Sequence, residues 1–348
     1  MVFYILRRLL TLPLMLFLIS AVLFFFILLI PVEQRAQAYL PAGNAGKTAE
    51  QEQAVMQAVI DKYGLDQPFP VQYIKWLQNL GRGDWGFSKD SRQPVMEVLL
   101  QRFPATLEMM LFALIPSVFL SIWLGERAAF NHNRWIDNLI RGGTSLGWAF
   151  PPFILGLILL NIFYAWQGWF PPMRLSLWAS ILVKSEAFRA YTGFFTLDAL
   201  LNGNLELFMD ALNHLVLPVL TLALVQTALL TRVMRASTLD VMKRDYLVTA
   251  RAKGLSEDRI FRQHARPNAI LPVVSTAGIA IPMWLSSVVV IEVIFHFEGV
   301  GFWAARAAQG LEIPAVVGFV LFSCTLTVLI SLGIDILYMV LNPLVRLE

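Results

Sequence analysis

The chain has 348 residues, of which 57% are hydrophobic and only 15% are charged. Soluble domains carry about a quarter charged residues, so this composition excludes a pair of ordinary soluble domains and indicates a membrane protein. The single cysteine, Cys324, lies in an apolar run and rules out a disulfide within the chain. The net charge is only +3, and we expect no nucleic-acid partner.

Six stretches are apolar and long enough to cross a bilayer, which takes about 20 residues per helix. We therefore predict an all-α membrane protein with six transmembrane helices. The first stretch exceeds the apolar region of about 7–15 residues found in signal peptides, so we expect it to be retained as a span. Prolines in or beside the stretches are candidate kinks, although membrane helices tolerate proline widely; they are Pro151, Pro152, Pro218, Pro272 and Pro282. The stretches run over 9–30, 104–125, 143–165, 214–231, 269–291 and 314–340.

Basic residues are concentrated in alternate connections between these stretches. Arg7 and Arg8 precede the first stretch, and connections rich in Lys and Arg face the cytoplasm. We therefore predict that both termini are cytoplasmic, together with a hairpin over 238–268. The counts of bases against acids are three to one in 127–141, three to four in 166–213, nine to four in 232–268 and one to three in 292–312.

The segment 32–103 balances eight bases against eight acids and is long enough to be translocated whatever its charge. We predict that it forms a small, mainly helical extracytoplasmic cap, with a helix over Glu50–Tyr63. Its apolar anchors are Trp76, Trp85 and Phe87.

The predicted organisation has three parts: a first span over 1–31, the extracytoplasmic segment 32–103, and a five-span core over 104–348 that contains the hairpin. The sequence GNAGKT at 43–48 ends like a phosphate-binding loop, but Pro41 stands where such a loop needs glycine. We interpret it as a polar turn.

The hairpin is unusually charged for this chain. It is predicted to begin as a helix continuing the fourth span, which Gly254 ends because glycine takes a positive φ without strain. Ser256 then begins a helix of about two turns, and Pro267 ends it before the fifth span. An alternative is a solvated connector that tucks a small apolar patch inward. The helix is expected to expose a face made of Ile260, Phe261 and His264.

The sequence DYLVTARAKGLSEDRIFRQHARPNAILP, residues 245–272, resembles the cytoplasmic loop of permease subunits of binding-protein-dependent ABC importers. The resemblance is to the oligopeptide/dipeptide/nickel branch and to its B-type subunit. Members carry an Ala-Ala-x3-Gly motif, which is degenerate here as VTARAKG at 248–254. They also carry a proline thirteen residues further on, matched by Pro267, and the peptide branch favours the His-Ala-x-x-Asn pattern seen at 264–268.

Other parts of the chain resemble the same branch. The end departs from it, because Asn342-Pro343-Leu344 stands where Asp-Pro-Arg is common, and the segment 166–213 is longer than expected. The matching stretches are KYGLDQPFPVQYIKWLQNLGRGDWGFS (62–88), NHLVLPVLTLA (213–223), RVMRAS (232–237), VVVIEVIFHFEGVG (288–301) and DILYMVLNP (335–343).

The resemblance implies a type I ABC importer permease fold in a bacterial or archaeal cytoplasmic (inner) membrane, crossed several times. A helix over 255–266 would be the coupling helix that docks on a cytoplasmic ATPase subunit, with Phe261 as the main apolar anchor. The implied docking residues are Ala250, Gly254, Leu255, Ser256, Ile260, Phe261, His264, Pro267 and Asn268. The implied gate or extracytoplasmic loop contains Glu292, Phe295, Gly299 and Gly301.

The resemblance also implies the partners: a second homologous permease, two cytoplasmic ATPase subunits, an extracytoplasmic substrate-binding protein and membrane lipid. The chain would be a non-catalytic subunit without a cofactor of its own, because ATP and Mg²⁺ would lie on the ATPase subunits. We expect peptides as the substrate from the branch alone.

Two other classes of protein remain as alternatives. An ion-gradient-driven secondary transporter could use Glu108, Glu292 and Asp335 as a proton relay, but the spans show no internal repeat. A membrane-embedded enzyme is disfavoured, because the four histidines have no metal-ligand spacing and no serine lies in a nucleophile motif.

Overall fold

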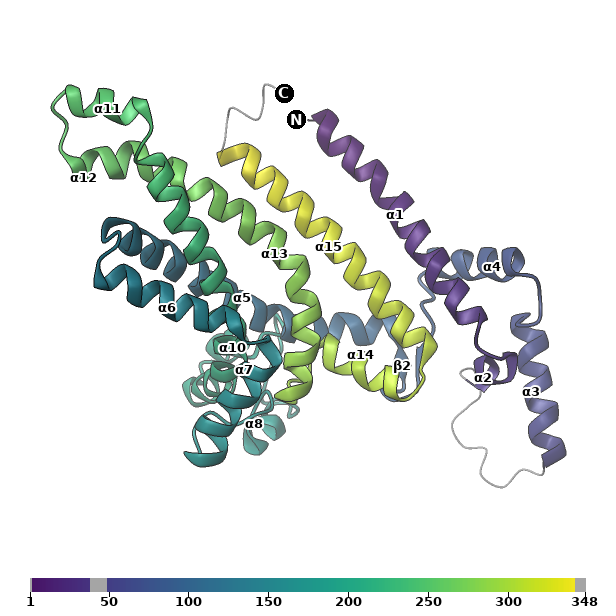
Figure 1. The fold of residues 1–348 in the computed structure, drawn as a ribbon. Helices are drawn as coiled ribbons and strands as arrows, with labels where there is room; N and C mark the ends of the chain where they lie inside the picture. The colour runs from purple at the N-terminus through teal and green to yellow at the C-terminus, as the bar shows by residue number, and fades with distance from the viewer. Residues whose placement is uncertain (1, 38–48, 342–348) are drawn as a thin grey trace. The chain divides into compact units, whose positions relative to one another are not determined.

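The computed structural model describes residues 2–37 and 49–341, and nearly all of its regular structure is helical (Figure 1). The predicted helical class is therefore confirmed. In the described part of the chain the only strands are β1 (Phe87–Ser88) and β2 (Gln93–Pro94), which pair antiparallel. The polar turn predicted at 43–48 lies outside the described residues. The helices are α1 (Val2–Leu28), α2 (Val32–Gln37), α3 (Ala49–Tyr63), α4 (Phe69–Gly81), α5 (Val95–Phe130), α6 (Trp135–Ala149), α7 (Pro152–Leu159), a π-helical segment (Leu160–Trp166), α8 (Leu177–Leu182), α9 (Phe195–Leu201), α10 (Leu205–Val241), α11 (Asp245–Ala252), α12 (Glu257–Ile260), a second π-helical segment (Phe261–Ala265), α13 (Arg266–Ile294), α14 (Val300–Gln309) and α15 (Ile313–Leu341).

In the part of the chain that the structure describes, three helices are long and apolar enough to cross a membrane: α5, α10 and the part of α15 over Ile313–Ile334. Within the same residues, the number rises to five if two bent helix pairs each count as one crossing. One pair is α6 with Pro152–Trp166, bent by 101°, and the other is Glu257–Ile281 with Met283–Ile294, bent by 56°. The described part of α1 from Pro13 onward is apolar but shorter.

The stretch predicted over 143–165 is not one continuous helix, and the candidate kink at Pro151 and Pro152 is a break. The chain leaves the helical conformation at Phe150, whose φ of −99° and ψ of 134° are those of extended backbone. Pro151 accounts for the break, because the residue before a proline is disfavoured in the α region. Pro218, by contrast, lies inside α10 without ending it.

The contacts divide the chain into two units. The first unit comprises residues 1–103 and 300–328, and the second comprises residues 104–299 and 329–348. The helices α5 and α15 each contribute one part to each unit.

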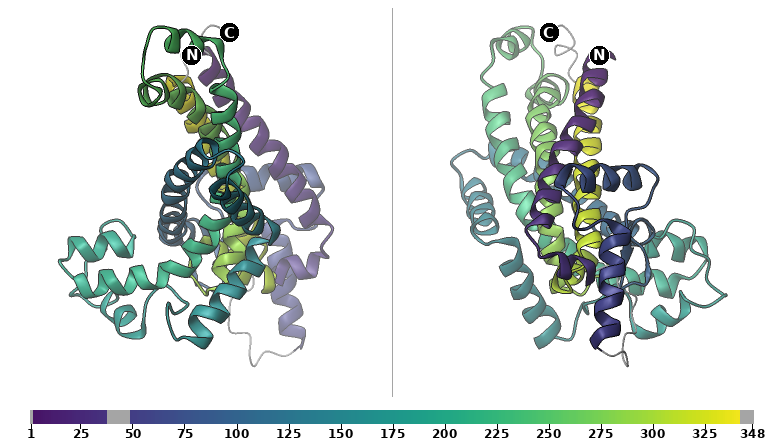
Figure 2. Two further views of the ribbon diagram at one scale, coloured as in Figure 1. Left: turned by 60° about the vertical axis from the view of Figure 1, so that its left-hand side comes forward. Right: turned by 90° about the vertical axis from the view of Figure 1, so that its right-hand side faces the viewer.

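In the first unit, α4 lies across α1 (Figure 2) and the two helices meet through aromatic rings. The ring centroid of Phe24 is 5.4 Å from that of Tyr73 and 5.5 Å from that of Trp76. The Tyr73 hydroxyl lies 2.8 Å from Ser20 Oγ. The predicted helix over 50–63 is present as α3.

The second unit is built on α10 and α13, which pack with α7 around a buried apolar core. The hairpin of α11 and α12 lies at one end of α10 and α13, and α8 and α9 lie at the other end of α10 (Figures 1 and 2). We call residues 167–204 the α8–α9 lobe. Core side chains include Met109, Leu217, Ile291, Phe295 and Phe297.

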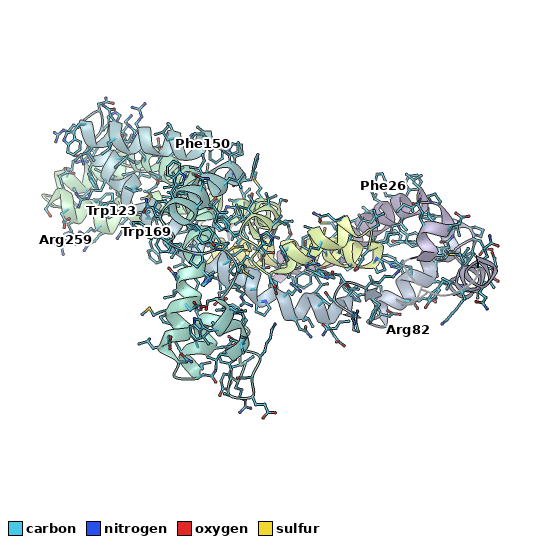
Figure 3. All side chains as sticks on the ribbon, turned by 90° about the horizontal axis from the view of Figure 1, so that it is seen from below. Phe26, Arg82, Trp123, Phe150, Trp169 and Arg259 are labelled. Atoms are coloured by element: carbon cyan, nitrogen blue, oxygen red, sulfur yellow. The ribbon has the colours of Figure 1, made fainter. Side chains whose placement is uncertain are left out.

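Large apolar side chains project outward from helices of both units (Figure 3). Phe26 on α1 and Trp123 on α5 are 60% and 53% exposed. Hydrocarbon, unlike water, imposes no penalty on such surfaces. The pattern is that of helices surrounded by lipid or by other membrane helices.

Candidate functional site

The predicted hairpin over 238–268 consists of two short helices joined at Gly254. The prediction that the first helix continues the fourth span is wrong, because α10 ends and the chain turns before α11 begins. Gly254 has a φ of +77°, which confirms the predicted left-handed turn. Ser256 begins α12 as predicted, but its side chain makes no capping hydrogen bond.

A charged pair closes this turn. Arg251 Nε donates to Glu257 Oε1 across 2.7 Å, so the end of α11 is tied to the first turn of α12. The hydrogen bond from Arg251 holds the pKa of Glu257 below its ordinary value. Both side chains are solvent-accessible, so the pair orients the turn more than it stabilises it.

The prediction that Pro267 ends the short helix is wrong. The helix α12 passes through the π segment Phe261–Ala265 directly into α13, of which Pro267 is the second residue. Proline supplies no N–H and its ring crowds the carbonyl four residues earlier. The wider π turn accommodates this interruption without ending the helix, and Asn268 Nδ2 donates to the His264 carbonyl oxygen across 2.8 Å.

The predicted exposed apolar face is wrong for two of its three residues. Ile260 and Phe261 are buried, and only His264 is exposed. The Phe261 ring packs edge-on against Phe130 at the end of α5, with ring centroids 4.5 Å apart. The alternative of an apolar patch tucked inward describes these two side chains correctly.

The other predicted docking residues divide by exposure. Ala250 is buried and Leu255 is half-buried, and both pack with Ile260 and Phe261 in one apolar cluster. The surface that the hairpin presents to solvent is therefore mostly polar. Its exposed members among the predicted residues are Gly254, Ser256, His264, Pro267 and Asn268.

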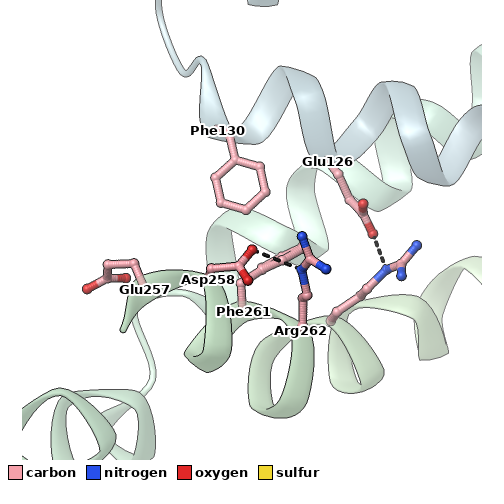
Figure 4. Close-up of a pocket in the computed structure, with 7 residues that line it drawn as sticks. Glu126, Phe130, Glu257, Asp258, Phe261 and Arg262 are labelled. Carbon is pink, nitrogen blue, oxygen red and sulfur yellow. Dashed lines mark hydrogen bonds and ion pairs between the residues drawn. The ribbon is translucent and has the colours of Figure 1, made fainter. Parts of the chain in front are cut away.

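A hollow of about 360 Å³ lies between the end of α5 and the helix of α12 and α13 (Figure 4). Two ion pairs cross or flank it: Arg262 Nε lies 2.9 Å from Asp258 Oδ1, and Arg266 Nε lies 2.7 Å from Glu126 Oε1. The second pair joins the hairpin to α5. The remaining lining residues are Phe130, Glu257 and Phe261.

A second contact near the hairpin fixes α6 to α10. The buried carboxylate of Asp137 accepts two hydrogen bonds from Arg235, at 2.6 and 2.7 Å, and a third from the Asn133 amide at 2.9 Å. A two-point arginine–carboxylate pair fixes orientation as well as distance. The end of α10 that leads into the hairpin is therefore held rigidly.

A cluster of buried charge lies where the α8–α9 lobe meets α5. Arg174 Nη2 donates to Glu108 Oε2 across 2.9 Å and to the Gly193 carbonyl across 2.7 Å. The other oxygen of Glu108 accepts from the Thr196 amide and hydroxyl, at 2.9 and 2.6 Å. Burial lowers the pKa of Arg174, and the neighbouring Glu108 carboxylate opposes that shift. The guanidinium also lies over the Phe195 ring, 3.8 Å from its centroid.

Three of the predicted gate residues lie together at the end of α13. Glu292 is fully buried and accepts from Thr106 Oγ1 on α5 across 2.6 Å. A Cβ on Gly299 would overlap the Glu292 carboxylate, so the glycine leaves room for the carboxylate where it lies. The Phe295 carbonyl accepts from the Met173 amide across 2.7 Å. The fourth predicted residue, Gly301, is buried in α14 of the first unit.

The comparisons with known proteins agree on one family. Residues 117–347 match the family described as binding-protein-dependent transport system inner membrane component, and residues 1–110 match its N-terminal companion family. The chain belongs to this family. It is the multi-pass inner-membrane permease subunit of an ABC importer.

The permease is similar to several curated relatives over most of their length. It is 38% identical to the probable D,D-dipeptide transport system permease protein of Escherichia coli, over 83% of this chain and 84% of the relative. It is 33% identical to the dipeptide transport system permease protein of Escherichia coli, over 94% of each. It is 36% identical to the oligopeptide transport system permease protein of Bacillus subtilis, over 84% of this chain and 85% of the relative.

Sequence reasoning missed the partners of the buried acids in the permease. Glu108 was singled out as an acid in an apolar run, but its partners Arg174 and Thr196 lie in the α8–α9 lobe. A buried carboxylate needs a compensating cation, and that requirement was the only sign in the sequence that Glu108 has a basic partner. It does not say which of the distant bases supplies the charge.

Proposed function

We propose that this permease carries peptides from an extracytoplasmic binding protein into the cytoplasm, paired with a second homologous permease and driven by two ATPase subunits. The hairpin carries this proposal: it offers a mostly polar, rigidly held surface at the end of the two helices that form the core of the second unit. The relatives' names support peptides as the substrate class. ATP and Mg²⁺ would be held by the ATPase subunits, and the permease itself would need no cofactor.

We propose that the hairpin docks through its exposed residues, while Ile260 and Phe261 support it from within. Polar rims around a small apolar centre are common in such interfaces. Because α12 runs without a break into α13, a push on α12 would reach α13 directly. The contacts of Phe261 with Phe130 and of Arg266 with Glu126 would carry the same push to α5.

We propose that the end of α13 around Glu292 and the part of α5 around Thr106 form the extracytoplasmic gate. Thr106 on α5 holds the Glu292 carboxylate of α13, so separation of the two helices would break this hydrogen bond. The backbone bond from Met173 to Phe295 would connect the α8–α9 lobe to the same place. A binding protein that docks on the lobe could therefore act on the gate.

We propose six spans with both termini in the cytoplasm. A topology reporter fused after Ser88 should read as extracytoplasmic, and one fused after Ser256 should read as cytoplasmic. Alkaline phosphatase and green fluorescent protein fusions measure the two sides separately. If both positions lay on the same side, the six-span arrangement would be wrong.

The function is tested by uptake into proteoliposomes containing both permeases and both ATPases. We expect a labelled dipeptide delivered by the binding protein to accumulate only with ATP, and excess unlabelled dipeptide to compete. The matched control replaces ATP with a proton or sodium gradient and omits the ATPases. Uptake under that control would favour a secondary transporter and overturn the proposal.

A further inference from the structure

The first unit contains a groove of about 720 Å³ that the proposed transport mechanism does not use. One wall is a single face of α1, because its residues recur at helical spacing. The lining residues of α1 span about one turn of that helix, and the volume of the groove lies within the range of about 300–1,000 Å³ typical of ligand pockets. The residues of this wall are Leu23, Phe26 and Ile27 of α1, and Ile30 just after its end.

The opposite wall is the connection from α14 to α15 and the first turns of α15. Ile313, Val316 and Val317 line it, again with the spacing of one helix face. The walls are thus almost wholly apolar over their length. Both belong to apolar helices of a protein that crosses the inner membrane, so hydrocarbon is their natural surroundings.

Three polar residues also line the groove: Gln34, Lys89 and Glu312. Burial lowers the pKa of Lys89, and the neighbouring Glu312 carboxylate opposes that shift. The Glu312 carboxylate is held in place by Ser88 Oγ at 2.9 Å and by the Asp90 amide at 2.7 Å. An ammonium group that burial disfavours gains from an added anion.

We propose that this groove binds a membrane glycerophospholipid, with one acyl chain between the walls and the phosphate at Lys89. Apolar walls along membrane helices accept hydrocarbon, and a lysine beside them accepts the phosphodiester at the level where head groups lie. The lipid would lie in a groove whose lining residues all belong to the first unit. This inference rests on the membrane location of the permease and not on its substrate.

The test is native mass spectrometry of the full importer complex, purified in detergent and supplied with phosphatidylglycerol or phosphatidylethanolamine. We expect lipid to remain on the permease through detergent washing. Lys89→Gln should lower the retained phosphatidylglycerol about fivefold, because one lysine near an anionic lipid is worth about 1 kcal/mol. Lys75→Gln is the matched control, since Lys75 is an exposed lysine of the same unit that does not line the groove, and it should change nothing.

A photo-crosslinking benzophenone side chain at Phe26 identifies the occupant directly. In membranes, we expect an adduct with the mass of a phospholipid. Capture of the second permease subunit would show that a protein helix fills the groove and would overturn the proposal. Equal retention of lipid in the Lys89→Gln and Lys75→Gln variants would overturn it as well.

Discussion

Replacing Gly254 with valine should uncouple ATP hydrolysis from transport while leaving the permease inserted in the membrane. Gly254 has a φ of +77°, and a Cβ there would meet nothing within 4 Å. The cost therefore comes from the backbone, at roughly 1–2 kcal/mol for a residue held in the left-handed region. The turn should relax to another φ and misaim α12, and uptake in proteoliposomes should fall by about 5- to 30-fold, the factor that such an energy produces.

Two matched variants separate backbone strain at the hairpin from strain in general. Gly254→Asn keeps the turn accessible, because asparagine tolerates the left-handed region better than valine, and should transport nearly normally. Gly168→Val introduces the same kind of strain in the α8–α9 lobe, where Gly168 has a φ of +70° and open space around it. It should leave the stoichiometry of ATP hydrolysed per peptide unchanged. Normal coupling in Gly254→Val would remove the hairpin from the mechanism.

Features set by a few neighbouring residues could be predicted from the sequence. Gly254 was identified because a left-handed turn between two helices is a local requirement that glycine meets best. The helix α3 followed in the same way from its composition. The break before Pro151 is also local, and Pro151 and Pro152 were candidate kinks. The apolar pattern of 143–165 did not show how sharp the bend would be, since apolar character is the same on both sides of a bend.

The direction of an apolar face could not be predicted. The spacing of Ile260, Phe261 and His264 predicted one shared helix face, but periodicity does not say which of these side chains the rest of the chain covers. In the structure Phe130 covers Phe261 from within the chain. Phe261 is therefore a residue that positions the hairpin, and its truncation would loosen α12 from α5.

Pro151 and Pro267 have opposite effects on the helix in which each was predicted to lie or end. Before Pro151 the chain is extended and the helix ends. Before Pro267 a π segment widens the helix and Asn268 bonds to the His264 carbonyl, so the helix continues. The difference depends on side-chain hydrogen bonds and on packing, which a sequence pattern of single residues does not contain.

The buried charges depend on contacts between distant segments. Arg174 and Glu108 are 66 residues apart, and nothing in either neighbourhood indicates the other. Removing one partner of a buried pair leaves an uncompensated charge and costs about 3–5 kcal/mol. Arg174→Met should therefore lower the thermal stability of the purified importer strongly, because the buried Glu108 carboxylate loses its cation and the Gly193 carbonyl loses its donor.

The double variant Glu108→Gln with Arg174→Met should recover most of that stability. Glutamine keeps an oxygen that accepts from the Thr196 amide and hydroxyl. No unpaired charge remains, and replacing a buried ion pair by uncharged groups often changes the stability little. Arg189→Met is the control, because Arg189 is an exposed arginine of the same lobe, and it should cost less than about 1 kcal/mol of stability.

Thermal unfolding of the three variants, followed by fluorescence-detected size-exclusion chromatography, gives the order of their stabilities directly. If Arg174→Met unfolded at the same temperature as Arg189→Met, the pair would not hold the lobe to α5. Recovered stability without recovered binding-protein stimulation of the ATPase would show that the charges themselves serve the proposed link from the lobe to the gate.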